Sequence, residues 1–245
     1  MLRKFLLLFL LIAGSLYAYD TRLDAYPSAK ANYERANKGD ADAAYNLAMF
    51  YDEKINDNDK AIEWYKTADA MGATHAAYNL GYVYEKELHD NQNALQWYKK
   101  AAKDGDVKAP SALGIVYDEL LRDYDKAIKW YTKAYDIGDV GGATNLGYLY
   151  YVTLKDIDNG VKWYSVAAKK GDSDAIKNLG NVYHDQGDNI KGAAYIFAMV
   201  NYGYTKEEVL DFLKNDWKLD RDTLQKAYEL QKTLDIPKHY TGGID

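Results

Sequence analysis

The sequence predicts an all-α protein, a right-handed α-solenoid built from helix-turn-helix repeats. First, the chain of 245 residues matches itself when it is shifted by 33 positions. Second, apolar residues within each unit recur at the spacing of helix turns. Third, proline occurs only 3 times and no long alternating Val/Ile run is present. These features favour stacked helix pairs over a sheet.

The period is clearest at a leucine that is followed by a small residue and then by a tyrosine. The leucine recurs as Leu47, Leu80, Leu113, Leu146 and Leu179. A Trp-Tyr pair and a closing glycine repeat later in the unit. The alignment predicts five repeats, at 40–72, 73–105, 106–138, 139–171 and 172–203.

Each repeat is expected to hold two amphipathic helices. In the first repeat, one helix carries the stripe Ala44, Leu47, Ala48 and Tyr51, at i, i+3, i+4 and i+7. The second helix repeats this spacing with the stripe Ala61, Trp64, Tyr65 and Ala68. Such stripes are typical of a core, so we interpret the aromatic residues as packing residues and not as a sugar-binding platform.

Capping residues mark the expected helix boundaries. Asp and Asn accept an otherwise unpaired N–H at a helix start, and glycine favours the left-handed conformation at a helix end. The predicted N-caps of the second helices are Asp57, Asp90, Asp123, Asp156 and Asn189. The closing glycines are followed by further candidate N-caps at Asp40, Asp106, Asp139 and Asp172.

The segments around the repeats have their own signals. Residues 19–39 are interpreted as a degenerate half-repeat. Residues 204–236 are expected to form C-terminal capping helices, opened by the capping box "TKEE" and ended by Pro237. The second of these helices would bury Leu224, Ala227, Tyr228 and Gln231. Residues 237–245 are expected to be a loose tail.

The N-terminus has the pattern of an export signal. Arg3 and Lys4 precede the apolar run "FLLLFLLIA", and a small residue, Ala18, follows. We expect a signal peptide at 1–18 with cleavage after Ala18, which places the protein in the periplasm or outside the cell. An uncleaved membrane anchor is the alternative, but the run is shorter than the ~20 residues that span a bilayer.

Charge and composition exclude several kinds of site. The formal net charge is −6, which disfavours a nucleic-acid binder. The cysteine count is 0, which leaves no thiolate nucleophile or thiolate metal ligand. The histidines lack the spacing of a metal site, and no phosphate-binding loop, GxSxG or SxxK motif occurs. We therefore expect no catalytic residues, no metal and no cofactor.

Two segments resemble a known repeat family. "YNLGYVY" followed by "ALQWYKKAAKDG", and "ATNLGYLY" followed by "VKWYSVAAKKG", resemble Sel1-like repeats, which are relatives of the tetratricopeptide repeat. The resemblance covers residues 40–203. It implies a protein-binding solenoid. Cysteine-rich Helicobacter members of this family are described as acting on β-lactams, but this chain lacks their cysteines.

The face of each first helix opposite the core is the candidate binding surface. At 100° per residue, positions 46 and 49 of the first repeat point away from its core stripe. Amides there offer a donor and an acceptor for a peptide backbone, and tyrosines offer contact area. The candidate residues on this expected concave face are Asn46, Asn79, Tyr82, Asn145, Tyr148 and Asn178.

Alternative roles stay open at this point. The asparagines would instead set the repeat geometry if they bond to the backbone of neighbouring repeats. The function expected first is an exported, non-enzymatic scaffold that binds a protein or peptide partner and no nucleic acid. A hydrolase of β-lactams or cell-wall peptides is the second hypothesis, and a membrane-anchored scaffold is the third.

Overall fold

The computed structural model describes residues 19–244, and the predicted signal peptide at 1–18 lies outside them. The described residues form helices and connecting turns, with no strand among them, as predicted for an all-α solenoid. Their contacts divide the chain into two units, and the boundary in the sequence follows Leu120. Within 19–244, no helix combines the length and the apolar character that crossing a membrane requires.

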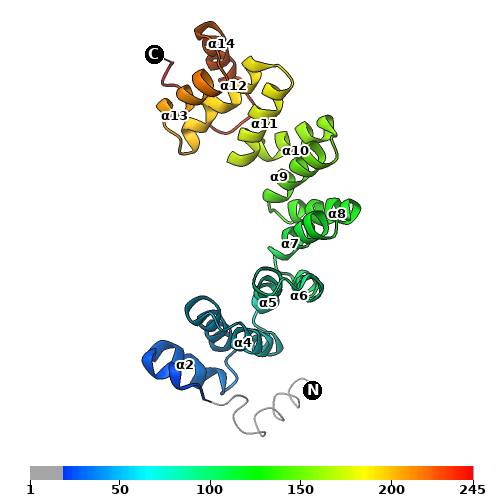
Figure 1. Ribbon diagram of the computed structural model, residues 1–245, viewed down its shortest axis with the longest axis vertical. Helices are drawn as coiled ribbons and strands as arrows, with labels where there is room; N and C mark the ends of the chain where they lie inside the picture. The colour runs from blue at the N-terminus through cyan, green and yellow to red at the C-terminus, as the bar shows by residue number, and fades with distance from the viewer. Residues whose placement is uncertain (1–18, 245) are drawn as a thin grey trace. The chain divides into compact units, whose positions relative to one another are not determined.

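The first unit contains the half-repeat, repeats 1 and 2, and the first helix of repeat 3. Each helix packs mainly on the helix before it and the helix after it in the chain (Figure 1). Every repeat can therefore bury its apolar face against its neighbours. The elements are η1 (Thr21–Ala25), α2 (Pro27–Ala36), α3 (Ala41–Met49), η2 (Phe50–Ile55), α4 (Asn58–Met71), α5 (Ala76–Tyr82), η3 (Val83–Glu87), α6 (Asn91–Asp104), α7 (Ala109–Ile115) and η4 (Val116–Leu120).

The second unit continues with the same pairing and ends in the terminal helices. Here α12 contacts both α11 and α14, so the last helix covers the end of the repeats. The elements are α8 (Tyr124–Asp136), α9 (Gly141–Tyr148), η5 (Leu149–Thr153), α10 (Ile157–Lys169), α11 (Ser173–Asp185), α12 (Asn189–Ala198), η6 (Met199–Tyr202), α13 (Lys206–Asp211), η7 (Phe212–Asp216) and α14 (Arg221–Gln231).

The first helices of repeats 1 to 4 end in a π-helical turn, which the sequence did not predict. The turns are η2, η3, η4 and η5. A residue with positive φ follows each of them, and none of these residues is glycine: Asn56, His89, Arg122 and Lys155. Repeat 5 differs, since α11 stays α-helical to Asp185 and Gly187 takes the left-handed conformation. The wider π-turn thus accompanies the loops that lack glycine.

Most predicted caps are confirmed. Asp57, Asp90, Asp123 and Asp156 each accept a backbone N–H at the start of a second helix. The prediction for Asn189 is wrong, because Asp188 is the N-cap and accepts from the Lys191 N–H. Repeat 5 closes one residue early at Gly203, and its cap has moved with it.

The caps of the first helices follow two patterns. Asp40 and Asp172 are N-caps of α3 and α11, as predicted. Asp106 and Asp139 stand further ahead, and Lys108 and Val140 are the N-cap residues. Asp106 still accepts from the N–H groups of Lys108 and Ala109, at 2.8 and 3.2 Å. The carboxylates therefore satisfy the helix start from an extra turn.

The repeated core positions are buried as predicted, with two exceptions: the tryptophan, and the tyrosine that ends the first-helix stripe, which is only partly buried at Tyr84, Tyr150 and Tyr183. The leucine, the small residue beside it and the tyrosine of the Trp-Tyr pair are buried in repeats 1 and 2. The tryptophan is buried only in repeat 1, where Trp64 is 2% exposed. The other three, Trp97, Trp130 and Trp163, are partly buried, and Trp97 and Trp163 still pack against core clusters.

The C-terminal segment departs from the prediction in two ways. The capping box of Thr205 and Glu208 is present, but α14 ends at Gln231 and not at Pro237. The tail is packed and not loose. The buried Gln231 amide donates to the Tyr240 carbonyl and accepts from the Tyr240 N–H, at 2.5 and 3.0 Å. This pairing holds Tyr240 and Ile244 against the core of the second unit.

Candidate functional site

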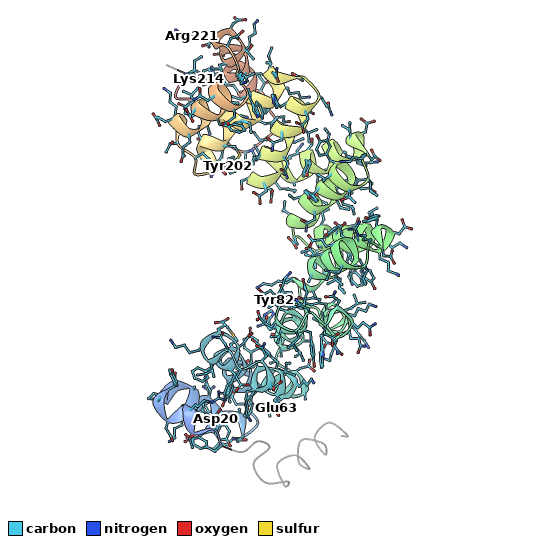
Figure 2. All side chains as sticks on the ribbon, viewed as in Figure 1. Asp20, Glu63, Tyr82, Tyr202, Lys214 and Arg221 are labelled. Atoms are coloured by element: carbon cyan, nitrogen blue, oxygen red, sulfur yellow. The ribbon has the colours of Figure 1, made fainter. Side chains whose placement is uncertain are left out.

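The six candidate residues lie on first helices, three in each unit. In the first unit, Asn46 lies on α3 and Asn79 lies on α5. Tyr82, which is labelled in Figure 2, also lies on α5. In the second unit, Asn145 and Tyr148 lie on α9 and Asn178 lies on α11. The two tyrosines are among the most exposed large side chains, at 46% for Tyr82 and 51% for Tyr148. They are therefore available for contact in both units.

Asn79 has a structural partner. Its side-chain amide donates to the hydroxyl of Tyr45, at 2.8 Å, and Tyr45 lies on the first helix of the preceding repeat. This bond joins two repeats through side chains, whereas the alternative role envisaged bonds to the backbone. Asn79 therefore helps to set the geometry between repeats 1 and 2.

The other three asparagines differ from Asn79. Within residues 19–244, the side chains of Asn46, Asn145 and Asn178 make no hydrogen bond, and Asn46 is exposed. The preceding repeats account for two of the three, because the residue at the position of Tyr45 is Ser111 before Asn145 and Thr144 before Asn178, and both side chains are shorter than tyrosine. The unpaired amides keep their full capacity to donate and accept.

A polar cleft of about 490 Å³ lies beside Asn79, between repeats 1 and 2 of the first unit. Its walls come from the π-turn η2 and the residue Asn56 after it, from α4, and from α5 with its π-turn η3. Three tyrosines, three amides and three carboxylates line it: Asp52, Glu53, Asn56, Asn58, Tyr65, Tyr78, Asn79, Tyr82 and Glu87. No Lys or Arg is among these residues.

The carboxylates of this cleft affect one another. The Asp52 carboxylate accepts from the Tyr65 hydroxyl at 3.1 Å. Burial raises the pKa of Asp52, the Tyr65 hydrogen bond opposes this, and the charges of Glu53 and Glu87 add to the rise. Within residues 19–244, none of the three acids forms an ion pair. The cleft thus concentrates uncompensated negative charge.

Repeats 2 and 3 meet at an equivalent junction with different chemistry. The Tyr98 hydroxyl donates to Glu85 at 2.8 Å, as Tyr65 does to Asp52. The next residue, however, is Lys86 where repeat 1 has Glu53, and its ammonium lies 2.6 Å from the Glu85 carboxylate. At the other lining positions Ala112 replaces Asn79 and Ile115 replaces Tyr82. The acid of the second junction is therefore neutralised within the protein.

The buried tyrosine-carboxylate bond was missed by the sequence reasoning. A signal for it exists, because an acid stands 13 residues before the buried tyrosine in repeats 1 and 2. The same spacing gives Asp118 before Tyr131 in repeat 3. In repeats 4 and 5 the position holds Tyr151 and His184, so the pattern fades along the chain.

The histidines serve as packing and capping groups. The His75 ring lies 2.7 Å from Asp106, whose side chain is fully buried, and His184 stacks on Trp217 with ring centroids 3.9 Å apart. Among the described residues, no group of three or more His, Asp or Glu side chains has the arrangement of a metal site.

Comparison with protein families accounts for the repeats. The family model described as the Sel1 repeat matches residues 41–71, 74–106, 112–139 and 142–172. These matches together cover about half of the chain and follow the first four predicted repeats. The fifth repeat, at 172–203, is not matched, although α11 and α12 pair in the same way.

Solved structures give the same result. The chain is similar to c5321, a protective antigen of uropathogenic Escherichia coli with an SLR fold, at 26% identity and a TM-score of 0.63. It is also similar to a Sel1 repeat protein from Oxalobacter formigenes, at 28% identity and a TM-score of 0.52. The matches cover 84% and 63% of this chain, but 48% and 66% of those proteins. No curated protein matches the chain.

Proposed function

This chain belongs to the Sel1 repeat family, and from that premise we propose that it is a scaffold that binds a protein or peptide partner through its first helices. Repeats of this kind are typical of protein-protein interaction. The observation that carries the proposal is the exposure of Tyr82 and Tyr148, which occupy the same repeat position in the two units. Exposed tyrosines beside amides are the composition of binding surfaces.

The finer parts of this proposal concern chemistry and location. The scaffold binds without catalysing a reaction, and it acts after export into the periplasm or beyond. The basic start, the apolar run and Ala18 support export. A mature chain that begins at Tyr19 in N-terminal sequencing is the expected result, and a chain that keeps its first residues would contradict export by cleavage. Turnover of nitrocefin by the purified protein would contradict the non-enzymatic role.

Affinity capture with matched variants tests the binding surface. We expect Tyr82→Ala with Tyr148→Ala to reduce partner capture at least tenfold, since each truncation removes an exposed aromatic anchor. Adding Asn79→Ala and Asn145→Ala should reduce it further. The control is Leu88→Ala with Ile157→Ala, because both side chains are 43% exposed and neither residue lies on a first helix. Equal capture by the tyrosine variant and the control would contradict the proposal, provided that helicity is unchanged.

A further inference from the structure

The cleft between repeats 1 and 2 has the chemistry of a receptor for a positive charge. Its three carboxylates, Asp52, Glu53 and Glu87, lie near enough for Glu53 and Glu87 to act on the Asp52 charge. Like charges that gather without a counter-ion destabilise one another, and a bound cation removes that cost. The volume of about 490 Å³ is larger than a single ion needs.

An aromatic wall adds a second element of recognition. The Tyr82 ring is 46% exposed and lines the cleft, and no cation lies over it among residues 19–244. A Lys or Arg group placed over a tyrosine face is attracted by the ring quadrupole. The neighbouring Tyr78 ring shows this attraction, since the Lys108 ammonium lies 5.8 Å from its centroid. Carboxylates and an open ring together fit a basic side chain.

The next junction lacks the features that make this cleft acidic. At the position of Glu53 the second junction has Lys86, which pairs with Glu85 at 2.6 Å. Lys86 thus supplies a positive charge from within the protein, whereas the first junction has no such charge at this position. The positions of Tyr82 and Glu87 hold Ile115 and Leu120 there, so both the ring and an acid are missing.

We propose that the cleft between repeats 1 and 2 binds a basic side chain, arginine or lysine, of the partner segment. The inference rests on the proposed function as a scaffold. It assigns the partner a positive residue at the point where its chain crosses α5. The carboxylates of Glu53 and Glu87 receive the charge, and Tyr82 covers the apolar stem. Asn79 stays in place through its bond to Tyr45.

Short synthetic peptides test this assignment without the natural partner. The probes are Ac-Gly-Ser-Ala-X-Ala-Ser-Gly-amide peptides in which X is arginine, lysine or citrulline, added to the purified protein and followed by its amide NMR spectrum. We expect the arginine and lysine peptides to shift resonances around the cleft in a saturable way. The citrulline peptide, which has nearly the same shape without the charge, should bind at least tenfold more weakly. Raising the salt should weaken the basic peptides only.

Two lysine substitutions provide a test variant and its matched control. Glu53→Lys imitates Lys86 and should weaken the arginine peptide at least tenfold. Glu119→Lys makes the same charge change at the same repeat position outside the cleft, and should change affinity less than twofold. If circular dichroism shows that Glu53→Lys is unfolded, Glu87→Gln takes its place, because Glu87 is exposed.

Several outcomes would overturn the inference. Equal binding of arginine and citrulline peptides, equal losses in the two lysine variants, or the same spectral shifts with calcium chloride alone would each do so. These outcomes are distinguishable from failure of the scaffold proposal. That failure appears as partner capture that survives Tyr82→Ala with Tyr148→Ala, whatever the peptides do.

Discussion

Two junctions between repeats contain the same buried hydrogen bond in different surroundings. One joins repeats 1 and 2, and the other joins repeats 2 and 3. Both bury a tyrosine that donates to a carboxylate of the preceding helix, Tyr65 to Asp52 and Tyr98 to Glu85. In the second junction the carboxylate is buried and paired with Lys86. In the first, the carboxylate faces an open acidic cleft. Both repeats therefore have the same internal tyrosine-carboxylate bond, but the carboxylate is paired within the protein in one junction and faces an open cleft in the other.

The largest expected effect is alkaline unfolding, which disrupts both junctions together. Burial raises the pKa of Tyr65 and of Tyr98, and it raises the pKa of Tyr195 to about 12. A raised folded pKa gives stability that is complete below pH 10 and lost as the pH rises through the folded value. Each such tyrosine costs about 1.4 kcal/mol per pH unit in that window. We expect helicity to be lost between pH 10 and 12, and tyrosinate absorbance at 295 nm to rise over the same range as the buried tyrosines ionise.

The reference for this experiment is the protein in guanidinium chloride, where tyrosines titrate near their ordinary value. Ionisation of every tyrosine near pH 10 in a chain that stays helical would contradict the expectation. Tyr65→Phe and Tyr98→Phe should each make the loss of stability with rising pH less steep, since each removes one group that ionises on unfolding.

The next effect concerns a repeat position at which the two junctions differ by one methyl group. The small residue is Ala48 in repeat 1 and Gly81 in repeat 2. A Cβ on Gly81 would lie 2.7 Å from the Tyr98 ring, which is 1% exposed. We expect Gly81→Ala to lower the free energy of unfolding by about 2 kcal/mol through overpacking. Ala48→Gly should cost about 1 kcal/mol through lost helix propensity. Urea unfolding measures both, and a stabilised Gly81→Ala would contradict this packing.

Removing the tyrosine hydroxyls compares the two carboxylates. Tyr98→Phe leaves the buried Glu85 without its donor, so we expect a loss of about 2 kcal/mol in the free energy of unfolding. Tyr65→Phe should cost about 1 kcal/mol, because water from the cleft replaces the donor at Asp52. Chemical denaturation of the two variants checks the order. A larger loss in Tyr65→Phe would show that Asp52 is the more strongly desolvated acid.

Neutralising the acids should give changes of opposite sign. Asp52 has a raised pKa, so its protonated form is the one favoured by folding and its charge is unfavourable at pH 7. Asp52→Asn keeps an acceptor for Tyr65, and we expect a gain of about 0.5 kcal/mol at pH 7 that disappears below pH 4. Glu85→Gln loses its pairing with Lys86 and should cost about 1 kcal/mol. Urea unfolding at pH 7 and pH 3 measures both, and a destabilised Asp52→Asn at pH 7 would remove the distinction.

The smallest effect lies in the loops after the first helices. Asn56 has φ of 55° and His89 has φ of 53° at the same repeat position. Glycine relieves left-handed strain but costs unfolded-state entropy, and asparagine tolerates this conformation well. We expect His89→Gly to stabilise by about 0.5 kcal/mol and Asn56→Gly to have an effect near zero. Thermal unfolding compares them, and equal shifts would show that the two loops are equally strained.

Sequence reasoning reached the helices and most of their ends, because caps and stripes are local. Asp57 and Asp90 cap the helices that their spacing predicts. It failed where one residue competes with a neighbour, as when Asp188 caps α12 instead of Asn189. It also missed the packed tail, since nothing near Tyr240 in the sequence indicates that the distant Gln231 would bind its backbone.

For the candidate site, sequence reasoning singled out Tyr82 and Tyr148, which are exposed on first helices. It placed Asn79 with other asparagines, although among the candidate asparagines in residues 19–244 only Asn79 bonds to a tyrosine of the preceding repeat. It did not find the acidic cleft, because Asp52, Asn79 and Glu87 belong to different elements and meet only when repeats stack. The acid that stands 13 residues before the buried tyrosine in repeats 1 to 3 is visible in the sequence, but its role depends on the tyrosine-carboxylate hydrogen bond that only the fold shows.

The sequence by itself determined the repeat, because a period of 33 residues with helical stripes has one economical solution, the stacking of helix pairs. Local rules of capping and amphipathicity are enough for that result. The tertiary structure alone decided which repeat-to-repeat junction became open and acidic. Charge at a junction depends on the side chains that two repeats bring together, and a single exchange, Glu53 in one repeat for Lys86 in the next, changes whether the acid is paired from within.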